Sequence, residues 1–594
     1  SGDGNTVHVA AGTYVENIDY DGKTISVIGA DRETTIIDGN ESGRAFRYYS
    51  SGNDQDFRIS GFTIKNGLYE DGAGMVINNS QITLENLIIK DNYATHNSGG
   101  INVSGGNPII KNCIVKNNNA GWAMGGIGFH QTNAKVINTL FTNNGPCYGS
   151  AFSSWTGSNV ELHHTTVVNN TGGWPIAAED NSNISFLNSI IWSNGDKQIA
   201  LGGCGSGCVD PDTLIVNYSL VENGLDSSIY FWDGGYSELI PGVGNIDVDP
   251  MFVDTANGNY HLLASSQLIN AGHPDSTDSD GTRADIGAYP YLNTYSGPNW
   301  FVSNNGNDTT ATGEGPSSFR SIQAAINFAS DGDAVSVSSG NYFENINFRG
   351  RAITVIGSGG STIDGGANGT VVTFDSGEDT TTVLNGFIIK NGSGTDAWPY
   401  AAGGILCNDA SPKLEDLVIE ENSGISAGGI VLYSSEAQLN NLIITNNSSS
   451  YGGGIYTDWS NPVMNNLVIT NNTGGAGGGI SLNNYSSPQI KNTLITDNIS
   501  SDQSGGVYCG NQSDPTLINV TIANNICSDH FSNGGAVTCY GSHPTLVNCI
   551  TFNNFPNEIV LDYIGDGSSV SVSYSNIQGG LDSIVTNNNG TVTW

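Results

Sequence analysis

A short phrase recurs thirteen times along this chain. In each copy an apolar residue stands two positions before a polar or glycine anchor, and further apolar residues stand one and three positions after it. The anchors are Gly61, Asn86, Asn112, Asn138, His164, Asn188, Gly386, Asp416, Asn441, Asn466, Asn492, Asn519 and Asn548. Neighbouring anchors within each half lie 24 to 30 residues apart. Self-similarity at a near-constant period, with β-branched residues at alternating positions, predicts a solenoid of stacked strands.

Two further signals predict the corners of each coil. An asparagine stands six positions after eleven of the anchors. Asparagine tolerates left-handed backbone angles, and stacked amides can bond to the coils above and below. Seven Gly-Gly-Ile or Gly-Gly-Val phrases, from Gly99–Ile101 to Gly505–Val507, predict another corner, where a side chain would clash or φ must be positive. We therefore expect three short strands per turn; helical and leucine-rich repeats lack support because the 3.6-residue periodicity is missing.

Composition excludes some classes of function. The chain has 80 glycines in 594 residues and only 12% charged residues, as a ladder of strands and tight turns requires. Its net charge of −38, from 56 acidic and 18 basic residues, argues against nucleic acid as a partner. The acidity predicts a secreted or surface location, although solubility alone also explains it. No apolar run approaches the roughly 20 residues that span a bilayer, so no transmembrane segment is expected.

The chain contains two copies of one plan. Gly12–Ile18 realigns with Gly340–Ile346 at an offset of 328 residues. We therefore predict two tandem units: residues 1–292 with a closing segment, a linker over 293–316, and residues 317–594.

A short helix is expected before the second copy. Ile322, Ala325, Ile326 and Ala329 fall on one helical face, and Ser318 or Ser321 can cap its start. Such a helix would cover the open edge of the first coil. The first unit starts after the equivalent helix, and the second stops before a closing segment. We expect from this a window on a longer polypeptide, or a processed form, whose end coils could dock head to tail.

These motifs resemble those of a known superfamily. Trp300–Asp308, the Ile322–Ile326 helix, Asp331–Asp333 and the repeats are similar to the secreted right-handed parallel β-helix proteins of the pectate-lyase-like superfamily. The Gly-Gly-Ile phrases are also similar to those of bacterial polymorphic outer-membrane autotransporters and adhesins. The closing segment, from Asp249–Phe252 to Ala284–Tyr289, resembles the end of β-helix units in surface proteins exported by type IX secretion. The resemblance implies an all-β, right-handed parallel β-helix. In that superfamily the sequence determines the fold far better than it determines the activity.

The resemblance also implies what a catalytic site would need. Sugar lyases of this superfamily use an Arg or Lys base and calcium held by carboxylates. Lys65, Lys90, Lys116 and Lys390 share one outward position and predict a solvated column instead. Arg44, Arg47 and Arg58 form the best remaining cluster, with Asp54 and Asp56 as companions or plain surface partners. His163 and His164 precede a strand, and His164 takes an anchor position, which favours a corner histidine over a catalytic base.

Aromatic residues gather on consecutive coils. Many follow the Gly-Gly corner by one to six positions, where their rings could stack on sugars or simply pack against the next coil. The candidates for carbohydrate binding are Trp122, His130, Tyr148, Trp155, Trp174, Tyr433, Tyr456, Trp459 and Tyr485.

Two loops suggest other sites. Asp278, Asp280 and Asp285 alternate around a glycine as in an oxygen-ligand calcium loop, although an Arg283–Asp turn explains the pattern nearly as well. Calcium is therefore a possible cofactor. Cys204 and Cys208 bracket a polar loop, which predicts a local disulfide, with a zinc site as the competing interpretation.

The favoured function is an extracellular structural β-solenoid that does not act as an enzyme. It would serve as a surface stalk, an adhesin or a fibre subunit, with a second copy of itself or a cell-surface polysaccharide as its partner. A polysaccharide-binding module, and a polysaccharide lyase or epimerase, are the alternatives.

Overall fold

The computed structural model describes residues 3–50, 54–202, 211–232, 237–395, 401–528, 534–562, 567–587 and 590–594. Within these ranges the chain is all-β, and its α-helices are α1 (Gly224–Ser228) and α2 (Ile322–Phe328). No helix among these residues is long and apolar enough to cross a membrane. By internal contacts the chain divides into unit 1 (Ser1–Leu292) and unit 2 (Asn293–Trp594). Cys204 and Cys208 lie outside the described residues, so the disulfide stays a prediction.

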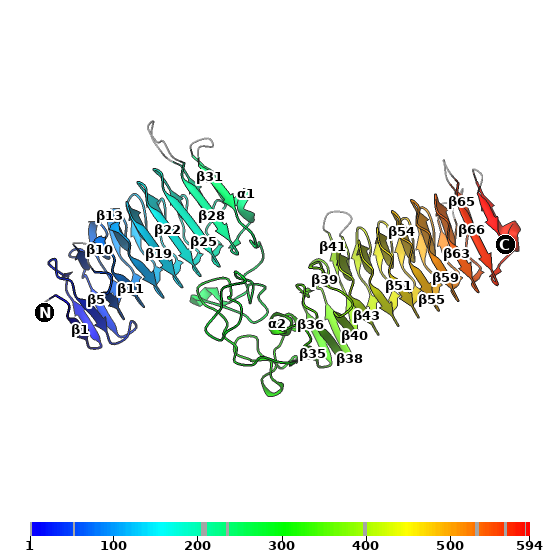
Figure 1. The fold of residues 1–594 in the computed structure, drawn as a ribbon, viewed down its shortest axis with the longest axis horizontal. Helices are drawn as coiled ribbons and strands as arrows, with labels where there is room; N and C mark the ends of the chain where they lie inside the picture. The colour runs from blue at the N-terminus through cyan, green and yellow to red at the C-terminus, as the bar shows by residue number, and fades with distance from the viewer. Residues whose placement is uncertain are drawn as a thin grey trace. The chain divides into compact units, whose positions relative to one another are not determined.

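Unit 1 is a parallel β-helix with three strands per coil (Figure 1). Sheet 1 runs from β1 (Thr6–Val9) and β4 (Ser26–Gly29) through β7 (Arg58–Ser60), β11 (Thr83–Glu85), β15 (Ile109–Lys111), β19 (Asn133–Ile137), β22 (Asn159–His163), β25 (Asn183–Leu187) and β28 (Thr213–Asn217) to β31 (Glu238–Pro241). Sheet 2 contains β2 (Gly12–Val15), β5 (Thr35–Asp38), β8 (Thr63–Lys65), β12 (Ile88–Lys90), β16 (Ile114–Lys116), β20 (Leu140–Thr142), β23 (Thr166–Val168), β26 (Ile190–Trp192) and β29 (Leu220–Val221).

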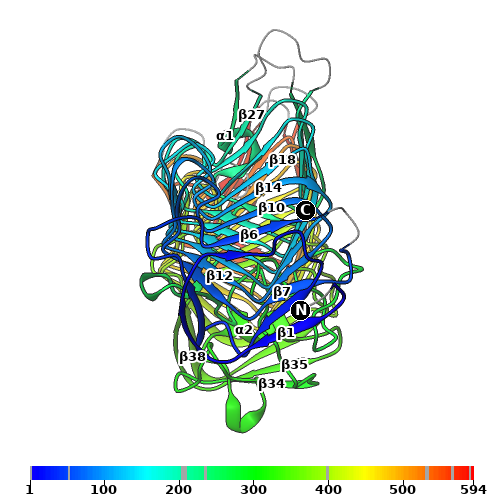
Figure 2. The same ribbon diagram turned by 90° about the vertical axis from the view of Figure 1, so that its left-hand side faces the viewer.

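Sheet 3 forms the remaining long face of unit 1 (Figure 2). It contains β3 (Ile18–Asp19), β6 (Phe46–Tyr49), β10 (Met75–Ser80), β14 (Ile101–Gly106), β18 (Ile127–His130), β21 (Phe152–Trp155), β24 (Ile176–Ala178), β27 (Ile199–Leu201) and β30 (Ile229–Phe231). A short parallel ladder of β9 (Leu68–Asp71), β13 (Tyr93–Asn97) and β17 (Asn119–Ala120) lies at one corner.

The aliphatic columns of the repeat fill the interior. Every residue two positions before an anchor in unit 1, from Ile59 to Phe186, is fully buried. Burying one such side chain stabilises the fold by about 1.5–3 kcal/mol, and each does so only because the next coil covers it. The predicted solenoid of stacked strands is confirmed.

The anchors are left-handed corners. The non-glycine anchors have φ between 47° at Asn138 and 58° at Asn519. The second asparagines, for which the sequence also suggests left-handed angles, do not have a positive φ; the residue before each does, as at Asn117 and Asn143. The Gly-Gly corner has a different cause. Neither Gly99 nor Gly100 has a positive φ, but a Cβ on Gly99 would lie 2.2 Å from the Asn119 carbonyl oxygen, and one on Gly100 would lie 2.5 Å from that of Gly126. Close approach of the backbones therefore selects glycine here.

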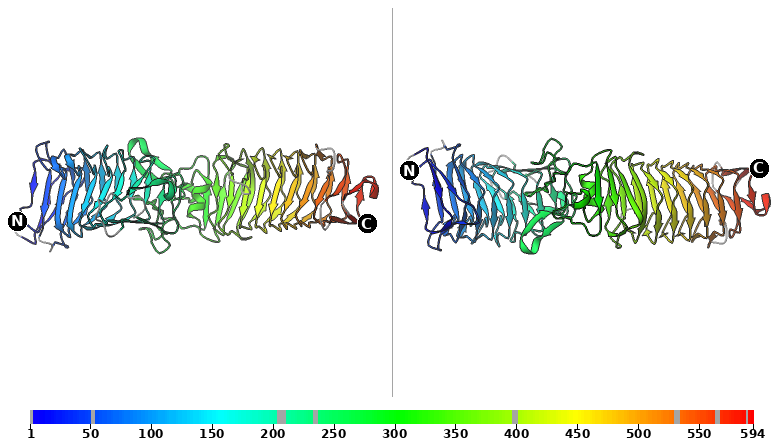
Figure 3. Two further views of the ribbon diagram at one scale, coloured as in Figure 1. Left: turned by 90° about the horizontal axis from the view of Figure 1, so that it is seen from above. Right: turned by 90° about the horizontal axis from the view of Figure 1, so that it is seen from below.

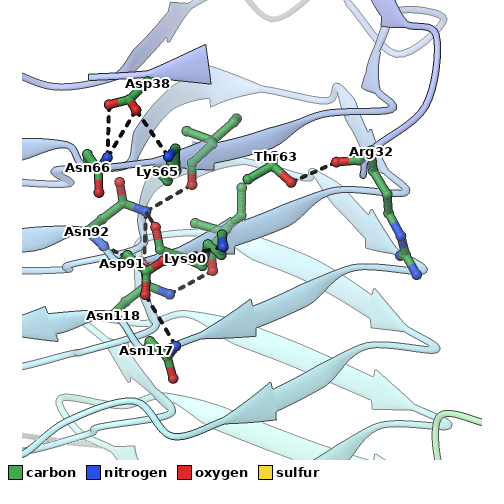
Figure 4. Close-up of polar contacts among 12 residues, drawn as sticks. Arg32, Asp38, Thr63, Lys65, Asn66, Lys90, Asp91, Asn92, Asn117 and Asn118 are labelled. Atoms are coloured by element: carbon green, nitrogen blue, oxygen red, sulfur yellow. Dashed lines mark hydrogen bonds and ion pairs between the residues drawn. The ribbon is translucent and has the colours of Figure 1, made fainter. Parts of the chain in front are cut away.

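Inside the coils the second asparagines form a ladder (Figure 4). The Nδ2 of Asn92 donates to Oδ1 of Asn118 at 2.9 Å, and the pattern continues through Asn144 and Asn170 to Asn194. The last Nδ2 donates to Gln198 Oε1 at 2.9 Å. In unit 2 the corresponding ladder runs from Asn422 to Asn554 and ends on Glu558 Oε2 at 2.8 Å.

The closing segment of unit 1 folds back onto the outer surface of sheet 2. It contains the antiparallel pair β32 (Phe252–Asp254) and β33 (Asn259–Leu262), joined by the 3₁₀ turn η1 (Thr255–Asn257). The Tyr260 hydroxyl is 2.9 Å from Thr142 Oγ1 and accepts from Asn169 Nδ2 at 3.0 Å. Contacts over more than ninety residues of sequence thus attach this segment to the coils.

Unit 2 begins earlier than the sequence suggests. β34 (Asn299–Val302) lies within the predicted linker 293–316, yet it pairs in parallel with β35 (Ala334–Val337). The predicted helix is present as α2: Ser321 Oγ accepts from the Ala324 N–H at 3.3 Å, and all seven residues are buried. The half-buried Glu344 also accepts, through its carboxylate, from the Ile322 and Gln323 N–H groups, at 2.8 and 3.0 Å.

The coils of unit 2 repeat the same plan (Figure 3). Its ten-stranded sheet contains β37 (Ile346–Asn347), β39 (Val372–Phe374), β42 (Ile405–Asn408), β46 (Ile430–Tyr433), β50 (Ile455–Asp458), β54 (Ile480–Asn483), β58 (Val507–Gly510), β62 (Val537–Tyr540), β65 (Ile559–Asp562) and β68 (Ile584–Thr586). A second sheet joins the other two faces, from β34 to β69 (Thr591–Thr593), and a short ladder runs from β41 (Ser393–Gly394) to β61 (Ile526–Cys527).

Candidate functional site

One outward column of sheet 3 carries polar and aromatic residues on successive coils. We call it the outer column. Its members pair in register, coil by coil: Tyr49, Asn78, Ser104, His130 and Trp155. Glu179 continues it by one coil, because its N–H donates to the Ser154 carbonyl at 2.9 Å. Parallel pairing without slippage places these side chains along a single line.

A groove of about 370 Å³ follows this column. The outer column from Tyr49 to Trp155 lines it, together with Asn102 of β14. Arg44, Asp71, Asn97 and Met124, from the neighbouring corner, form the opposite side.

The floor of the groove presents unused hydrogen-bonding groups. The side chains of Asn78, Asn102, Ser104 and His130 make no hydrogen bond or ion pair with any residue in the described part of the chain. All four are half-buried. The row therefore offers neutral donors and acceptors to a molecule that enters the groove.

Aromatic rings flank this row. Trp122 is 59% exposed, lies 6.1 Å from the Trp155 ring and stacks on His96 at 5.2 Å. Farther along the coils, Trp174 contacts Tyr148 at 5.7 Å and stacks on Tyr230 at 5.1 Å. The five candidates predicted in unit 1 are thus neighbours on one side of that unit.

Sequence reasoning missed two members of this aromatic group. Tyr230 and Trp232 are 42% and 48% exposed, and Trp232 lies 4.9 Å from the Trp174 ring. They belong to the last coil of sheet 3, which lacks the Gly-Gly phrase. In the structure Tyr230 pairs with Ala200 of the preceding coil, and this pairing gives the alignment of the last coil that the sequence repeat does not show.

Glu179 was missed as well. Burial, reinforced by the negative charges of Asp180 and Asp212, raises the pKa of its carboxyl to about 7. The polar groups of Tyr148 and Trp155 beside the carboxylate offset part of this rise in pKa. Its position in the sequence could have identified it, because Glu179 occupies the outer column one coil after Trp155. A carboxyl that changes charge near neutral pH therefore lies beside the tryptophan.

The candidates in unit 2 do not form a comparable site. Tyr456 is only 2% exposed, packs against Leu406 and Val431, and donates to Asp458 Oδ2 at 3.3 Å. Its predicted role as a sugar platform is wrong in this structure because no ring face is accessible. Trp459 and Tyr485 are about half exposed and stack on each other at 4.9 Å. Tyr433 is half-buried on β46.

The calcium candidates serve as hydrogen-bond acceptors. Asp285 is buried and accepts from the N–H groups of Asn270 and Tyr291 at 2.7 Å each; burial raises its pKa to about 8. Asp278 accepts from the Asp285 N–H at 2.8 Å, and Asp280 from that of Thr282 at 3.0 Å. The described residues contain no group of three or more His, Cys, Asp or Glu side chains that could hold a metal ion. Calcium at this loop stays a prediction.

Arg283 does not make the alternative Arg–Asp turn. Its Nε donates to the Gly272 carbonyl at 2.6 Å. No ion pair joins it to a carboxylate within the described ranges.

The remaining catalytic candidates have structural partners. His164 has φ 51° and its Nε2 lies 3.2 Å from Asn188 Nδ2, as a corner histidine would. Burial lowers the pKa of both His163 and His164. The Arg44 guanidinium donates to the carbonyls of Gly72 and Asp71 at 2.9 and 2.7 Å.

Comparison with known proteins agrees with the fold. The sequence model of the right-handed β-helix region family matches residues 45–239. That region is therefore similar to this family, and the parallel coils of the structure agree with a right-handed parallel β-helix. No curated protein sequence matches the chain.

Three solved structures illustrate how distant its structural neighbours are. Pectate lyase Pel9A is 12% identical with a TM-score of 0.32, over 49% of this chain and 79% of that one. A pectin methylesterase from Yersinia enterocolitica is 13% identical with a TM-score of 0.26, over 46% and 94%. The PL6 family alginate lyase AlyGC is 11% identical with a TM-score of 0.21, over 100% and 98%. Such low similarity carries no information about the activity of this chain.

Proposed function

We propose that the protein is an extracellular β-helix that binds a polysaccharide along the groove of unit 1. The observation that supports this most is the row of Asn78, Asn102, Ser104 and His130, unpartnered within the described chain, beside the exposed Trp122. Sugars present hydroxyls at their edges and apolar patches on their faces. Neutral amide and hydroxyl groups next to aromatic rings complement both.

The spacing of the coils favours a polymer over a single sugar. Strands of successive coils lie about 4.8 Å apart, so the outer column offers one side chain per step along a straight line. A linear polysaccharide also repeats its hydrogen-bonding groups at regular steps. A chain parallel to the stack could therefore make the same kind of contact on several coils.

The engaged arginine of the groove favours binding over lyase chemistry there. A uronate lyase uses a free Arg or Lys as its base, but Arg44, the cation of the groove lining, is committed to two backbone carbonyls. The two β-helical units then serve as a structural scaffold. A scaffold that carries a polysaccharide-binding groove is consistent with a role as a cell-surface stalk or adhesin, with a polysaccharide as the partner.

Removal of the rings tests the proposal. Binding of the full chain to soluble neutral polysaccharides, such as xylan, β-glucan and galactomannan, would be measured by affinity electrophoresis and calorimetry. We expect Trp122→Ala and Trp155→Ala each to weaken binding about tenfold, because one stacked ring contributes on the order of 1 kcal/mol. Tyr574→Ala is the matched control, since Tyr574 is 91% exposed and belongs to unit 2. Absence of binding to every polysaccharide, or unchanged binding by both tryptophan variants, would refute the proposal.

A further inference from the structure

A second cavity lies beneath the closing segment of unit 1, outside the groove. It has a volume of about 600 Å³, within the usual range for small-molecule sites. Sheet 2 supplies its floor through β16 and β20, and the η1 turn and β33 cover it. The residues that define its chemistry are Arg32, Lys116, Tyr260, His261 and Tyr289.

The charge of this cavity is opposite to that of the chain. The protein has 56 acidic and 18 basic residues, yet the cavity lining contains Arg32 and Lys116 and no aspartate or glutamate. His261 adds no charge near neutral pH, because burial lowers its pKa. A lining of this composition favours an anion.

Lys116 differs from the other lysines of its column. One and two coils earlier, Lys90 lies 3.5 Å from Asp91 and Lys65 lies 3.2 Å from Asp38 (Figure 4). Lys116 pairs in register with Lys90, but its ammonium group has no ion-pair partner among the residues that the structure describes. Its charge is therefore available to a ligand.

Two hydrogen bonds hold Arg32 in place, one at its backbone carbonyl and one from its guanidinium group. Thr63 Oγ1 donates to its carbonyl at 2.7 Å, and its Nη1 donates to the Asn112 carbonyl at 2.9 Å (Figure 4 shows the first contact). Glu33 lies 3.8 Å from Nε and is mostly exposed. A guanidinium has five N–H donors, so several remain for an anionic group.

Aromatic side chains in the walls of this cavity are suited to contact with a sugar ring. His261 stacks on Tyr289 at 4.6 Å with 20° between the planes. Asp254 borders the η1 turn, where its carboxylate accepts from the Asn257 backbone N–H at 3.2 Å and from Nδ2 at 2.7 Å, and it is not part of the cavity lining.

We propose that this pocket binds a small anionic sugar, with its charged group recognised by Lys116 and Arg32 and its ring against Tyr289 and His261. The site is separate from the groove, and the proposal does not depend on the function proposed for the groove.

The test compares sugars that differ in charge. Glucose, glucuronate, glucose 6-sulfate and glucose 6-phosphate would be titrated against the full chain by calorimetry and ligand-observed NMR. The three anions should bind and glucose should not, and the order among them identifies the preferred group. Failure of every anion to bind, or binding of glucose as tight as that of the anions, would overturn the proposal.

Charge removal locates the binding. Lys116→Gln and Arg32→Gln should each weaken binding of the preferred anion at least about tenfold, as loss of a charged hydrogen bond predicts. Lys90→Gln, one coil away in the same column, should leave it unchanged. Equal affinity of Lys116→Gln and the unmodified chain would contradict the site. Circular dichroism spectra and thermal midpoints that match those of the unmodified chain provide the check on folding.

Discussion

At the scale of single residues, the buried asparagines hold neighbouring coils together. The side chain of Asn144 makes four hydrogen bonds: its Nδ2 donates to the Val115 carbonyl and to Asn170 Oδ1, both at 2.9 Å, and its Oδ1 accepts from the N–H and Nδ2 of Asn118. Each ladder asparagine thus satisfies backbone groups that the tight corner leaves unpaired.

Replacement of a ladder asparagine should therefore be costly. Asn144→Ala leaves a buried N–H and a buried carbonyl without partners, and we expect a loss of at least about 3 kcal/mol in the free energy of unfolding. Asn138→Gly, at an anchor on the same coil, keeps the left-handed corner and should cost less than about 1 kcal/mol. Chemical denaturation followed by circular dichroism measures both, and similar losses in the two variants would contradict the role of the ladder.

Glu179 should make stability depend on pH. The pKa of its carboxyl is raised from the ordinary 4.5 to about 7, so between these values the folded protein binds more protons than the unfolded chain. Stability therefore falls as pH rises through this window. Asp285 and Glu344, whose pKa values burial also raises, act in the same direction.

The Glu179 contribution is isolated by Glu179→Gln. Relative to the unmodified chain, this variant should gain up to roughly 3 kcal/mol between pH 4.5 and 8, as a pKa raised from 4.5 to about 7 implies. Glu161→Gln is the control, because Glu161 lies on an outward position of sheet 1, 3.8 Å from Lys135 and 46% exposed. Parallel stability–pH curves for Glu179→Gln and the unmodified chain would show that the raised pKa is wrong.

At the scale of elements, the Gly-Gly corners set how closely successive coils pack. Gly100→Ala would place a Cβ 2.5 Å from the Gly126 carbonyl oxygen, where the backbone must move. We expect a loss above about 2 kcal/mol and faster proteolysis of unit 1. Gly173→Ala has no atom within 4 Å of the added Cβ and should change stability by less than about 0.5 kcal/mol. Equal protease resistance of the two variants would remove the steric explanation.

The sequence predicts those elements whose residue types the coil geometry restricts. The anchors, the ladder asparagines and the Ser321-capped helix are all of this kind. The outer column is not, since Tyr49, Ser104, His130 and Glu179 face outward and packing does not restrict their type. The closing segment also escapes prediction: Tyr260 meets Thr142 across 118 residues, and no periodic pattern marks that contact. The groove and the anionic pocket depend on these two features.

At the scale of the whole molecule, charge repulsion opposes folding. A net charge of −38 acts over about 30 Å at 10 mM salt but over about 8 Å at 150 mM. We therefore expect the thermal midpoint to rise by several degrees when sodium chloride increases from 10 to about 150 mM. Differential scanning calorimetry at pH 7 checks this, and a midpoint that falls with salt would indicate that attractive ion pairs dominate instead.

The asparagine ladder has a direction. In the bonds between side chains, every amide donates to the asparagine of the later coil. One end of the ladder therefore presents an acceptor, met by the Gly67 N–H, and the other presents a donor, met by Gln198. Any coil between them has the same donor above and acceptor below as its neighbours. Such coils are interchangeable, so a gene can gain or lose one at a time while both end pieces stay the same. The length of the protein can then evolve in single-coil increments without a new fold.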